Sequence, residues 1–540
     1  MYTPRLIVVG VCSALIAAAI AVAGAGASAG RSLAGSVCVG NKPACFATIE
    51  QAVDAAHDGD TIAIGPGTFA GGISIDVSVT LKGAGAATTT ISGGAPVLTI
   101  GVPDAATEPT VAIKGVTITG GVAVSNPTDP AGRRNFGGGI EIPWAADGAT
   151  GATVTISDSV VTGNRAIPTT SVPSGGAQCP GGPCPFARGD GGGIGNFGNL
   201  TLIRTTLSNN VAGGPVASDS HGGGIWSAGV GTLTLESSTV TGNDSIVAIP
   251  NGRFAIGGGV HVQDGGALTI RNSVVSNNSA SLTSLLPRGI GMQANGGGIH
   301  VGNDSAVAID NSTISGNDVT VNDPNGEPAG YDSAIILGES SLVMRNSTVH
   351  DNHTNVLVAS TADAGPSGTA LEVDGGSTIS NTRITDNSTT VTAVAGAADA
   401  AGTVFSFPQA LEPVLIENSL ISDNSVTASA TGGPATVNGA ALTNQGPLEL
   451  RNTRIADNSG VATGPTGAAE GGGIWNGVLI PFPEGPPVEL VLTNTTLTGN
   501  LLSGSPGLTI RGGGLFTSFP VALDNSRITN NVPDQCFGCG

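Results

Sequence analysis

The stretch GGGIWSAGVGTLTLESSTVTGN, residues 222–243, decides the fold of this 540-residue chain. Its second half alternates apolar and small polar residues, which is the period-two pattern of a β-strand. Counted back from Asn243, apolar residues stand three, eight and ten positions earlier, at Val240, Leu235 and Leu233. Apolar residues at offsets of two and five do not share one face of a helix, so the stretch predicts strands.

The same pattern recurs along the chain, and its closing Asn returns eleven times at intervals of 31 to 46 residues. These residues are Asn164, Asn210, Asn243, Asn278, Asn317, Asn352, Asn387, Asn424, Asn458, Asn500 and Asn531. The part from the glycines to the Asn is short and regular, whereas extra residues mostly fall between an Asn and the next glycines. Such a period predicts a solenoid, in which each repeat is one coil with a loop of variable length.

Two columns of asparagine follow from this repeat. Stacked coils lie about 4.8 Å apart, so the amide of one closing Asn can donate to the amide carbonyl of the next, which satisfies buried polar groups. Six positions earlier, the last eight copies carry another Asn, from Asn272 to Asn525. We expect Asn381, between Asn346 and Asn418, to sit in the middle of a ladder and to stabilise the fold more than Asn525 does.

Glycine triplets recur with the coil. They stand at 137–139, 191–193, 222–224, 257–259, 296–298, 471–473 and 512–514. Because no Gly-Lys-Ser/Thr follows them, they indicate tight bends and close backbone contacts and argue against a phosphate-binding loop.

Two stretches carry a resemblance to known proteins. The 222–243 segment resembles the repeats of bacterial right-handed parallel β-helix proteins, including the polymorphic outer-membrane type. Residues 45–75, CFATIEQAVDAAHDGDTIAIGPGTFAGGISI, are similar to the N-terminal cap and first coils of the pectin-lyase-like superfamily. The resemblance covers residues 38–535 and implies an all-β, right-handed parallel β-helix with a short N-terminal capping helix.

The predicted organisation has four parts: a signal peptide at 1–29, a cap region at 30–60, the β-helix at 61–535 and a cysteine-containing tail at 536–540. Within the cap region, residues 46–57 have the helical spacing of apolar residues at Ile49, Ala52, Val53 and Ala56. A helix there would cover the open first coil. The far end also needs a cover, because exposed strand edges promote aggregation.

The N-terminus predicts export. An apolar run from Leu6 to Ala23 is followed by Ala27-Ser28-Ala29, the small-residue pattern that a signal peptidase reads. We expect cleavage after Ala29 and an extracellular or cell-surface location. The alternative is an uncleaved membrane anchor, for which the run is marginally long enough.

The cysteines agree with an oxidising compartment. Apart from Cys12 in the signal segment, the cysteines fall into three close pairs, which we predict to be disulfides: Cys38 with Cys45, Cys179 with Cys184, and Cys536 with Cys539. The Cys536–Cys539 spacing is also that of half a zinc site, but no second pair or histidine stands near it.

Composition limits the partners. Charged residues are 11% of the chain, aromatic residues 3%, and the net charge is -20. This acidic balance excludes a nucleic-acid surface, which needs clustered basic residues. We expect a monomer that meets a membrane only if the N-terminal segment is retained.

The resemblance implies esterases, lyases and hydrolases that act on acidic polysaccharides, so their motifs can be sought here. The esterase glutamate is replaced in Gly67-Thr68-Phe69-Ala70-Gly71, and the hydrolase Asp pair, its "GHG" and "RIK" segments and the lyase "RxPxxR" segment are missing. No catalytic residue can be carried over. The leading prediction is a non-catalytic scaffold that binds a polysaccharide or a cell-surface partner through its side face and loops. The alternative is a divergent polysaccharide lyase or glycoside hydrolase, for which two carboxylates suffice.

An acidic column precedes the closing Asn in four successive coils, at Asp351, Asp386, Asp423 and Asp457. Carboxylates stacked at strand spacing must bind a cation, pair with arginine or retain protons. Calcium is the candidate metal, and otherwise no cofactor is expected. Arg383 and Arg454 offer pairing, which favours a solvated, partly neutralised turn over a calcium site.

A ring-bearing column is the candidate carbohydrate site. The residue after the glycines and their inward Ile or Val points outward, and in three consecutive coils it is Trp226, His261 and His300. Sugar rings stack on exposed flat side chains, so this strip predicts saccharide binding, unless neighbouring apolar loops fold over it. A metal held by the two histidines would need a third ligand such as Asp264.

Overall fold

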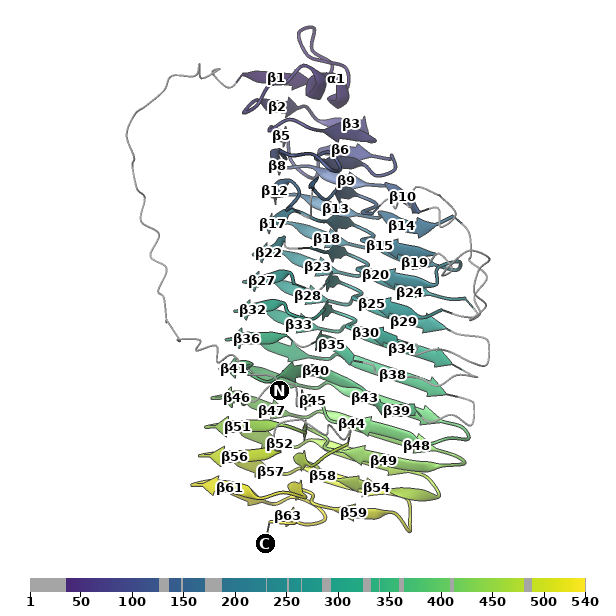
Figure 1. Ribbon diagram of the computed structural model, residues 1–540, viewed down its shortest axis with the longest axis vertical. Coiled ribbons are helices and arrows are strands. Elements are labelled where there is room, and N and C mark those ends of the chain that lie inside the picture. The colour runs from purple at the N-terminus through teal and green to yellow at the C-terminus, as the bar shows by residue number, and fades with distance from the viewer. Residues whose placement is uncertain are drawn as a thin grey trace, which may run out of the picture.

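The computed structural model describes residues 35–125, 136–146, 149–169, 187–229, 231–249, 252–263, 265–283, 293–323, 332–338, 340–358, 364–407, 412–479 and 488–539. Its strands stack into one long column of parallel coils, with the first coils (purple) at the top of Figure 1 and the last coils (yellow) at the bottom. The predicted all-β, right-handed parallel β-helix is confirmed.

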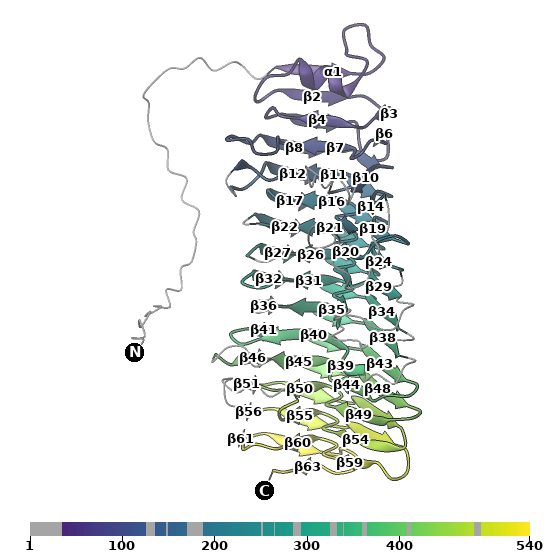
Figure 2. The same ribbon diagram turned by 45° about the vertical axis from the view of Figure 1, so that its right-hand side comes forward.

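Three long sheets form the walls of the main column (Figure 2). Sheet A has 15 strands, from β1 (Ser36–Val39) to β61 (Val521–Asp524). Sheet B has 14 strands, from β3 (Gly67–Ala70) to β62 (Arg527–Thr529). Sheet C also has 14 strands, from β4 (Ile73–Ile75) to β63 (Cys536–Phe537).

A side lobe widens the column. Sheet D, with 11 strands from β10 (Val122–Ser125) to β58 (Leu501–Gly504), faces two short sheets of four and five strands. The four-stranded sheet contains β15 (Arg188–Asp190), β20 (Asp219–His221), β25 (Phe254–Ile256) and β30 (Gln293–Asn295). The five-stranded sheet runs from β39 (Ala364–Ser367) to β59 (Thr509–Arg511).

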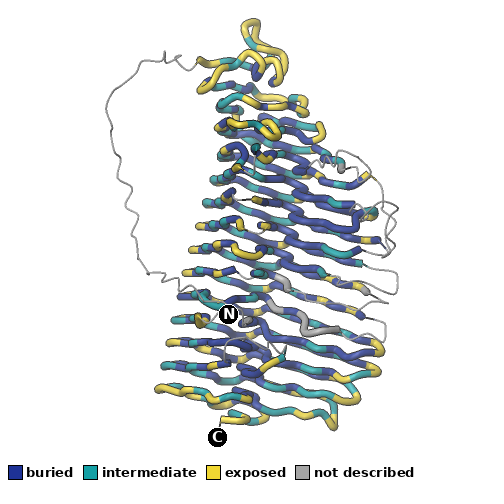
Figure 3. Tube along the Cα trace, in the orientation of Figure 1, coloured by how far each residue is buried: buried dark blue, intermediate teal, exposed yellow. Residues whose placement is uncertain are grey.

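Each repeat of the sequence forms one coil, and a single coil in the middle of the column illustrates its path through the sheets. It passes through β22 (Thr232–Glu236) in sheet A, β23 (Thr239–Thr241) in sheet B, β24 (Asp244–Val247) in sheet D, β25 in the four-stranded sheet and β26 (Val260–Val262) in sheet C. Alternate residues of the strands are buried, and much of the trace between the two ends of the column is dark blue in Figure 3. Sheets A, B and C enclose one apolar core, and the lobe encloses a second, smaller one.

The predicted ladder of closing asparagines is confirmed, and it lies at the narrow neck between the two cores. In each step, the Nδ2 group of one Asn donates to the Oδ1 atom of the next, as in Asn278 to Asn317 at 2.9 Å. The same Oδ1 also accepts from the backbone N–H of Asn278, and Asn278 Nδ2 donates to the carbonyl of Val240. The ladder ends on Gln535, whose Oε1 accepts from the backbone N–H of Asn531 at 3.1 Å.

The glycine triplets allow two backbones to meet at this neck. The first glycine of each triplet has a positive φ, for example 62° at Gly257. A Cβ on the second, Gly258, would lie 2.3 Å from the carbonyl oxygen of Ser279, and a Cβ on the third, Gly259, would lie 3.0 Å from the Asn278 carboxamide. The triplets therefore make room for the ladder on the opposite side of the neck.

The second asparagine column has a different role from the one predicted. Asn381 is exposed and has a φ of 50° at the corner between sheets A and B. Its Nδ2 lies 3.4 Å from Asn346 Oδ1, a long contact at the surface. The expectation that Asn381 occupies a buried ladder is wrong, because the left-handed turn turns its side chain toward solvent.

The buried column at that corner consists of Ser and Thr. Ser273 Oγ accepts from the backbone N–H of Ser238 at 3.0 Å, and Ser312 Oγ accepts from Ser273 at 3.1 Å. These hydroxyl oxygens therefore accept the hydrogen bonds of backbone N–H groups in the turn.

The two ends of the column differ. At the N-terminus, α1 (Ile49–Asp54) buries Ile49, Ala52 and Val53, and the side chain of Thr48 caps it. The helix is shorter than the predicted 46–57, and sheet A already begins at Ser36, within the predicted cap region. At the other end, β63 and Gln535 cover part of the last coil, but Leu523 is 49% and Val532 51% exposed, so much of this end is left uncovered up to residue 539.

Candidate functional site: an elbow between two sheets

The candidate site is the elbow where the outward face of the four-stranded sheet meets that of sheet C. Gly189, Ser220, Ala255 and Ala294 are buried on the lobe side of the four-stranded sheet, so Asp190 and His221 point the other way. Ile225 and Val260 belong to the main core, so Trp226 and His261 also point outward. The two faces meet because each glycine triplet bends the chain between them, and the rings of His221 and His261 lie 5.2 Å apart.

The predicted ring-bearing column is present in this elbow. Trp226 pairs in register with His261, and His261 with His300 in β31 (Ile299–Val301). The two imidazole rings are 4.8 Å apart and nearly perpendicular. Register and outward direction are therefore as the sequence predicted.

The expectation of an exposed strip is wrong. Trp226 is 4% and His261 6% exposed. The indole packs against the rings of Phe136 at 4.7 Å and Phe197 at 4.8 Å, which come from the two preceding coils. Trp226 has no open face on which a sugar ring could stack.

Charged side chains form the other wall of the elbow. His221 Nδ1 lies 2.7 Å from Asp190 Oδ1 and 2.9 Å from an Arg188 Nη2 group. Asp190 is 2% exposed and His221 6%. Nδ1 can donate to Asp190 only when it carries the proton, and it can accept from the Arg188 guanidinium only when it does not, so the two contacts favour opposite tautomers of the neutral ring.

Burial sets the ionisation of several groups here. It raises the pKa of Asp219, against the opposing charges of His221 and the nearby arginines. It lowers the pKa of His300 to about 3 and that of His261 well below its usual value, so both rings are neutral. Glu141 of β11 (Ile140–Ile142) lies two coils before Trp226 on the same column, and burial raises its pKa to about 7.

Four buried polar atoms in the elbow lack a hydrogen-bond partner within the described part of the chain: Asp219 Oδ1, Trp226 Nε1, His261 Nδ1 and His300 Nδ1. Buried polar groups in proteins are almost always paired, and each exception requires an explanation. Three of the four belong to the column that the sequence identified.

The column continues to the C-terminal end of sheet C. Trp475, Phe516 and Phe537 follow one another in register, and their rings stack with interplanar angles of 11° and 3°. Trp475 Nε1 donates to Glu470 Oε2 at 3.2 Å. The indole N–H of Trp475 therefore has a hydrogen-bond partner, whereas that of Trp226 has none in the described part of the chain.

The acidic column lies away from the elbow, on the turn from sheet B to sheet D. Asp351, Asp386, Asp423 and Asp457 are exposed and have φ values of 53° to 60°. Asp, Asn and Gly tolerate this left-handed conformation best, which explains why all three residue types recur at this position. Asp457 lies 3.7 Å from Arg454, and Asp351 2.6 Å from His350.

Metal ligands do not gather in the parts of the chain that the structure describes: no three His, Cys, Asp or Glu side chains are close enough together to hold an ion. Asp264, the third ligand considered for the two histidines, lies outside the described residues.

Two of the three predicted disulfides are present, Cys38–Cys45 and Cys536–Cys539. The third, Cys179–Cys184, lies outside the described residues, as does the signal segment at 1–29. No helix within the described ranges is long and apolar enough to cross a membrane.

Comparison with known proteins places the chain in a family. Residues 193–532, more than half of the chain, match the family described as right handed beta helix region, and the chain belongs to that family. A comparison with curated proteins gives no significant match.

Several solved structures are similar to the chain at low identity. The mannuronan C-5 epimerase AlgE6 A-module of Azotobacter vinelandii is 15% identical, with a TM-score of 0.25 over 91% of this chain and 93% of that one. A polygalacturonase from Erwinia carotovora ssp. carotovora is 12% identical, with a TM-score of 0.26 over 91% and 99%. PfbA, a surface adhesin of Streptococcus pneumoniae, is 13% identical, with a TM-score of 0.20 over 75% and 86%.

Sequence reasoning missed the charged wall of the elbow. Asp190 and His221 immediately precede glycine triplets, in RGDGGG and DSHGGG, and this position was the available signal. The sequence does not show that these two side chains point toward sheet C, because the direction of a side chain before the bend depends on where the lobe places its own core.

Proposed function

We propose that the chain is an exported β-helix protein, secreted or held at the cell surface, that binds a polysaccharide in the elbow without cleaving it. The observation that supports this most strongly is the set of four unpartnered buried polar atoms, on Asp219, Trp226, His261 and His300. A bound ligand would supply the missing hydrogen bonds.

The chemistry of these atoms favours sugar hydroxyls. The indole N–H of Trp226 can only donate, whereas a neutral imidazole offers one donor and one acceptor. A hydroxyl group both donates and accepts, so one type of ligand group serves all four atoms. The atoms are spread over successive coils, which suits an extended chain that lies along the column. Contact is through hydrogen bonds, since the face of Trp226 is already covered by Phe136 and Phe197.

Acid–base chemistry on the bound polysaccharide is a second candidate function. Asp190 orients His221 at 2.7 Å, which is the arrangement of a base held by a carboxylate. Burial raises the pKa of Asp219 and raises that of Glu141 to about 7, and such perturbed groups cluster at catalytic sites.

A glycan array probed with the mature protein tests the first proposal, and assays for new reducing ends and unsaturated products on each bound glycan test the second. Binding without products supports a non-catalytic role. Products from a bound glycan would assign a lyase or hydrolase, and the absence of binding to any glycan would reject both.

A further inference from the structure

Three neighbouring strands of sheet D each begin with a polar residue that directly follows a closing Asn. The strands are β34 (Asp318–Asp323), β38 (His353–Val358) and β43 (Ser388–Ala393). Their first residues, Asp318, His353 and Ser388, pair in register across three successive coils. The residue after each of them is buried on the lobe side, so the three first residues point outward, where each is half-buried. The outer face of sheet D therefore carries an acid, an imidazole and a hydroxyl group in one column.

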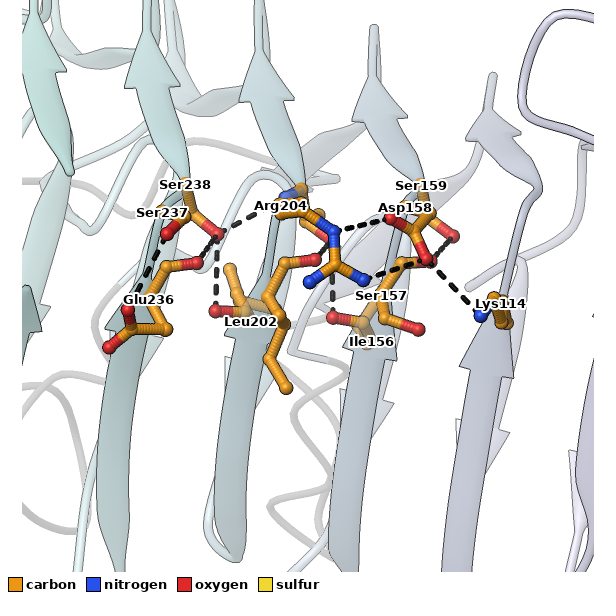
Figure 4. A network of polar contacts seen from close by, with 12 residues as sticks. Lys114, Ile156, Ser157, Asp158, Ser159, Leu202, Arg204, Glu236, Ser237 and Ser238 are labelled. Carbon is orange, nitrogen blue, oxygen red and sulfur yellow. Dashed lines mark hydrogen bonds and ion pairs between the residues drawn. The ribbon is translucent and has the colours of Figure 1, made fainter. Parts of the chain in front are cut away.

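Stacked coils can join such side chains into one chain of polar contacts. At the corner between sheets A and B, Lys114, Asp158 and Arg204 come from three successive coils, and Asp158 contacts both cations (Figure 4). Arg204 Nε lies 2.7 Å and Lys114 Nζ 3.5 Å from the carboxylate of Asp158. The central group of that chain is a carboxylate held between charges. In sheet D the central group is an imidazole, which can take up and release a proton.

His353 contacts its neighbour in the following coil and is influenced by its neighbour in the preceding one. Its Nδ1 atom lies 2.7 Å from Ser388 Oγ, so the hydroxyl group of Ser388 can donate to it when the ring proton is on Nε2. Burial raises the pKa of the Asp318 carboxyl, and the charge of His353 opposes that shift. A hydroxyl group within hydrogen-bond reach of a base, with a carboxyl group acting on that base, is the arrangement that activates a serine as a nucleophile.

We propose that Asp318, His353 and Ser388 form a site that hydrolyses small carboxylic esters, with Ser388 as the nucleophile and His353 as the base. Asp318 is a positioning residue, whose negative charge stabilises the protonated imidazole. Asn355 and Thr390 follow His353 and Ser388 by two positions and are register partners on the same outward face. Their side-chain donors can stabilise the negative charge that develops on the ester oxygen. The site lies on sheet D, so it rests on neither the elbow nor a ligand bound there.

The reaction needs only water as a second reactant. Ser388 Oγ forms a bond to the carbonyl carbon of the ester, and its proton passes to His353 Nδ1. The bond from that carbon to the alcohol oxygen then breaks, and the alcohol leaves with the proton from Nδ1. Water attacks the acyl-serine and gives a proton to Nδ1. The bond between the acyl group and Oγ breaks, the carboxylic acid leaves, and Oγ takes the proton back.

The test treats the mature protein with p-nitrophenyl acetate and, separately, with a fluorophosphonate that labels nucleophilic serines. We expect the ester to be hydrolysed, and mass spectrometry of the labelled protein should find the phosphonyl group on Ser388. Ser388→Ala should abolish both reactions, and His353→Gln should slow both by at least about 100-fold. Ser425→Ala is the matched control, because Ser425 is the register partner of Ser388 in the next coil, on the side away from His353. This variant should react as the unmodified protein does.

The role of Asp318 has its own measurement. Asp318→Asn should lower kcat by at least about tenfold and leave KM unchanged, because Asp318 acts on the base and does not touch the ester. A changed KM with an unchanged kcat would remove Asp318 from the site.

Three results would overturn the proposal as a whole: ester hydrolysis that is unchanged in Ser388→Ala, label on Ser425 as readily as on Ser388, or no label on either serine. Circular dichroism melting of each variant verifies that the compared proteins are folded. All the substituted side chains are only half-buried and point away from the lobe core, so their replacement leaves the core packing intact.

Discussion

Asn387 Nδ2 donates to Asn424 Oδ1 at 3.0 Å, and both side chains are almost completely buried at the neck between the two cores. Asn381, only six residues earlier, is exposed on the outer corner. We therefore expect Asn387→Ala to lower the free energy of unfolding by about 1–3 kcal/mol for each partner it leaves unpaired. Asn381→Ala should change it by less than about 0.5 kcal/mol. Denaturant titrations of the two variants provide the measurement, and equal midpoint shifts would contradict the assignment of the buried ladder.

The third glycine of a triplet should not tolerate a methyl group. A Cβ on Gly298 would lie 2.9 Å from the carbonyl oxygen of Ala334 and 3.0 Å from the Asn317 carboxamide. We expect Gly298→Ala to cost about 2 kcal/mol or more, because both neighbours are fixed by the ladder and the sheet. Gly65→Ala is the control, since its Cβ would meet only the Val39 carbonyl oxygen at 3.4 Å. A similar melting temperature for both variants would show that the neck can widen.

Trp226→Phe should weaken glycan binding and leave the fold intact. Phenylalanine keeps the contacts with Phe136 and Phe197 but removes the unpartnered Nε1–H group. Loss of one hydrogen bond corresponds to about a tenfold lower affinity at most. Trp475→Phe is the matched control, because that indole already donates to Glu470. If both variants bind equally well, the elbow does not hold the ligand through Trp226.

Trp226→Ala tests packing instead of binding. Removing a buried indole from the cluster with Phe136 and Phe197 should cost about 3–5 kcal/mol. Thermal unfolding of this variant should therefore begin well below that of Trp226→Phe. Equal melting temperatures would mean that the aromatic cluster contributes little to the fold.

The raised pKa of Glu141 predicts that the stability of the fold depends on pH. Its pKa rises from 4.5 to about 7 on folding, so between these values the unfolded chain loses a proton that the folded chain keeps. The contribution of Glu141 to stability is therefore greatest below pH 4.5, and it falls by about 3 kcal/mol as the pH rises through 7.

The variant Glu141→Gln removes this penalty. It should melt at a higher temperature than the unmodified protein at pH 8 and at a similar temperature at pH 4. Glu50→Gln, on the exposed side of α1, controls for the loss of one charge. A constant difference between Glu141→Gln and the unmodified protein from pH 4 to pH 8 would disprove the predicted linkage.

Export predicts a defined N-terminus. If Ala27-Ser28-Ala29 is cleaved, the secreted protein begins at Gly30, which N-terminal sequencing would detect. Recovery of the intact chain from membranes would identify the segment as an anchor.

The sequence by itself determined the repeat, the parallel stacking and the buried Asn ladder. These features depend on residues that must recur in every coil, since each coil pairs with the same positions of its neighbours. The register of Trp226, His261 and His300 followed from the same counting, because alternation along a strand fixes which side chains point outward.

Tertiary structure alone decided what surrounds each outward side chain. The lobe, with its separate core, turns Asp190 and His221 toward sheet C and creates the elbow. Phe136 and Phe197 cover Trp226 from preceding coils, at positions that no repeat fixes. The two Asn columns look alike in the sequence, but one faces the neck and the other faces water, because the backbone at the second corner adopts a positive φ. The local sequence pattern specifies which side of its strand a side chain points to. Whether that side chain is buried depends on how the bends bring distant strands together.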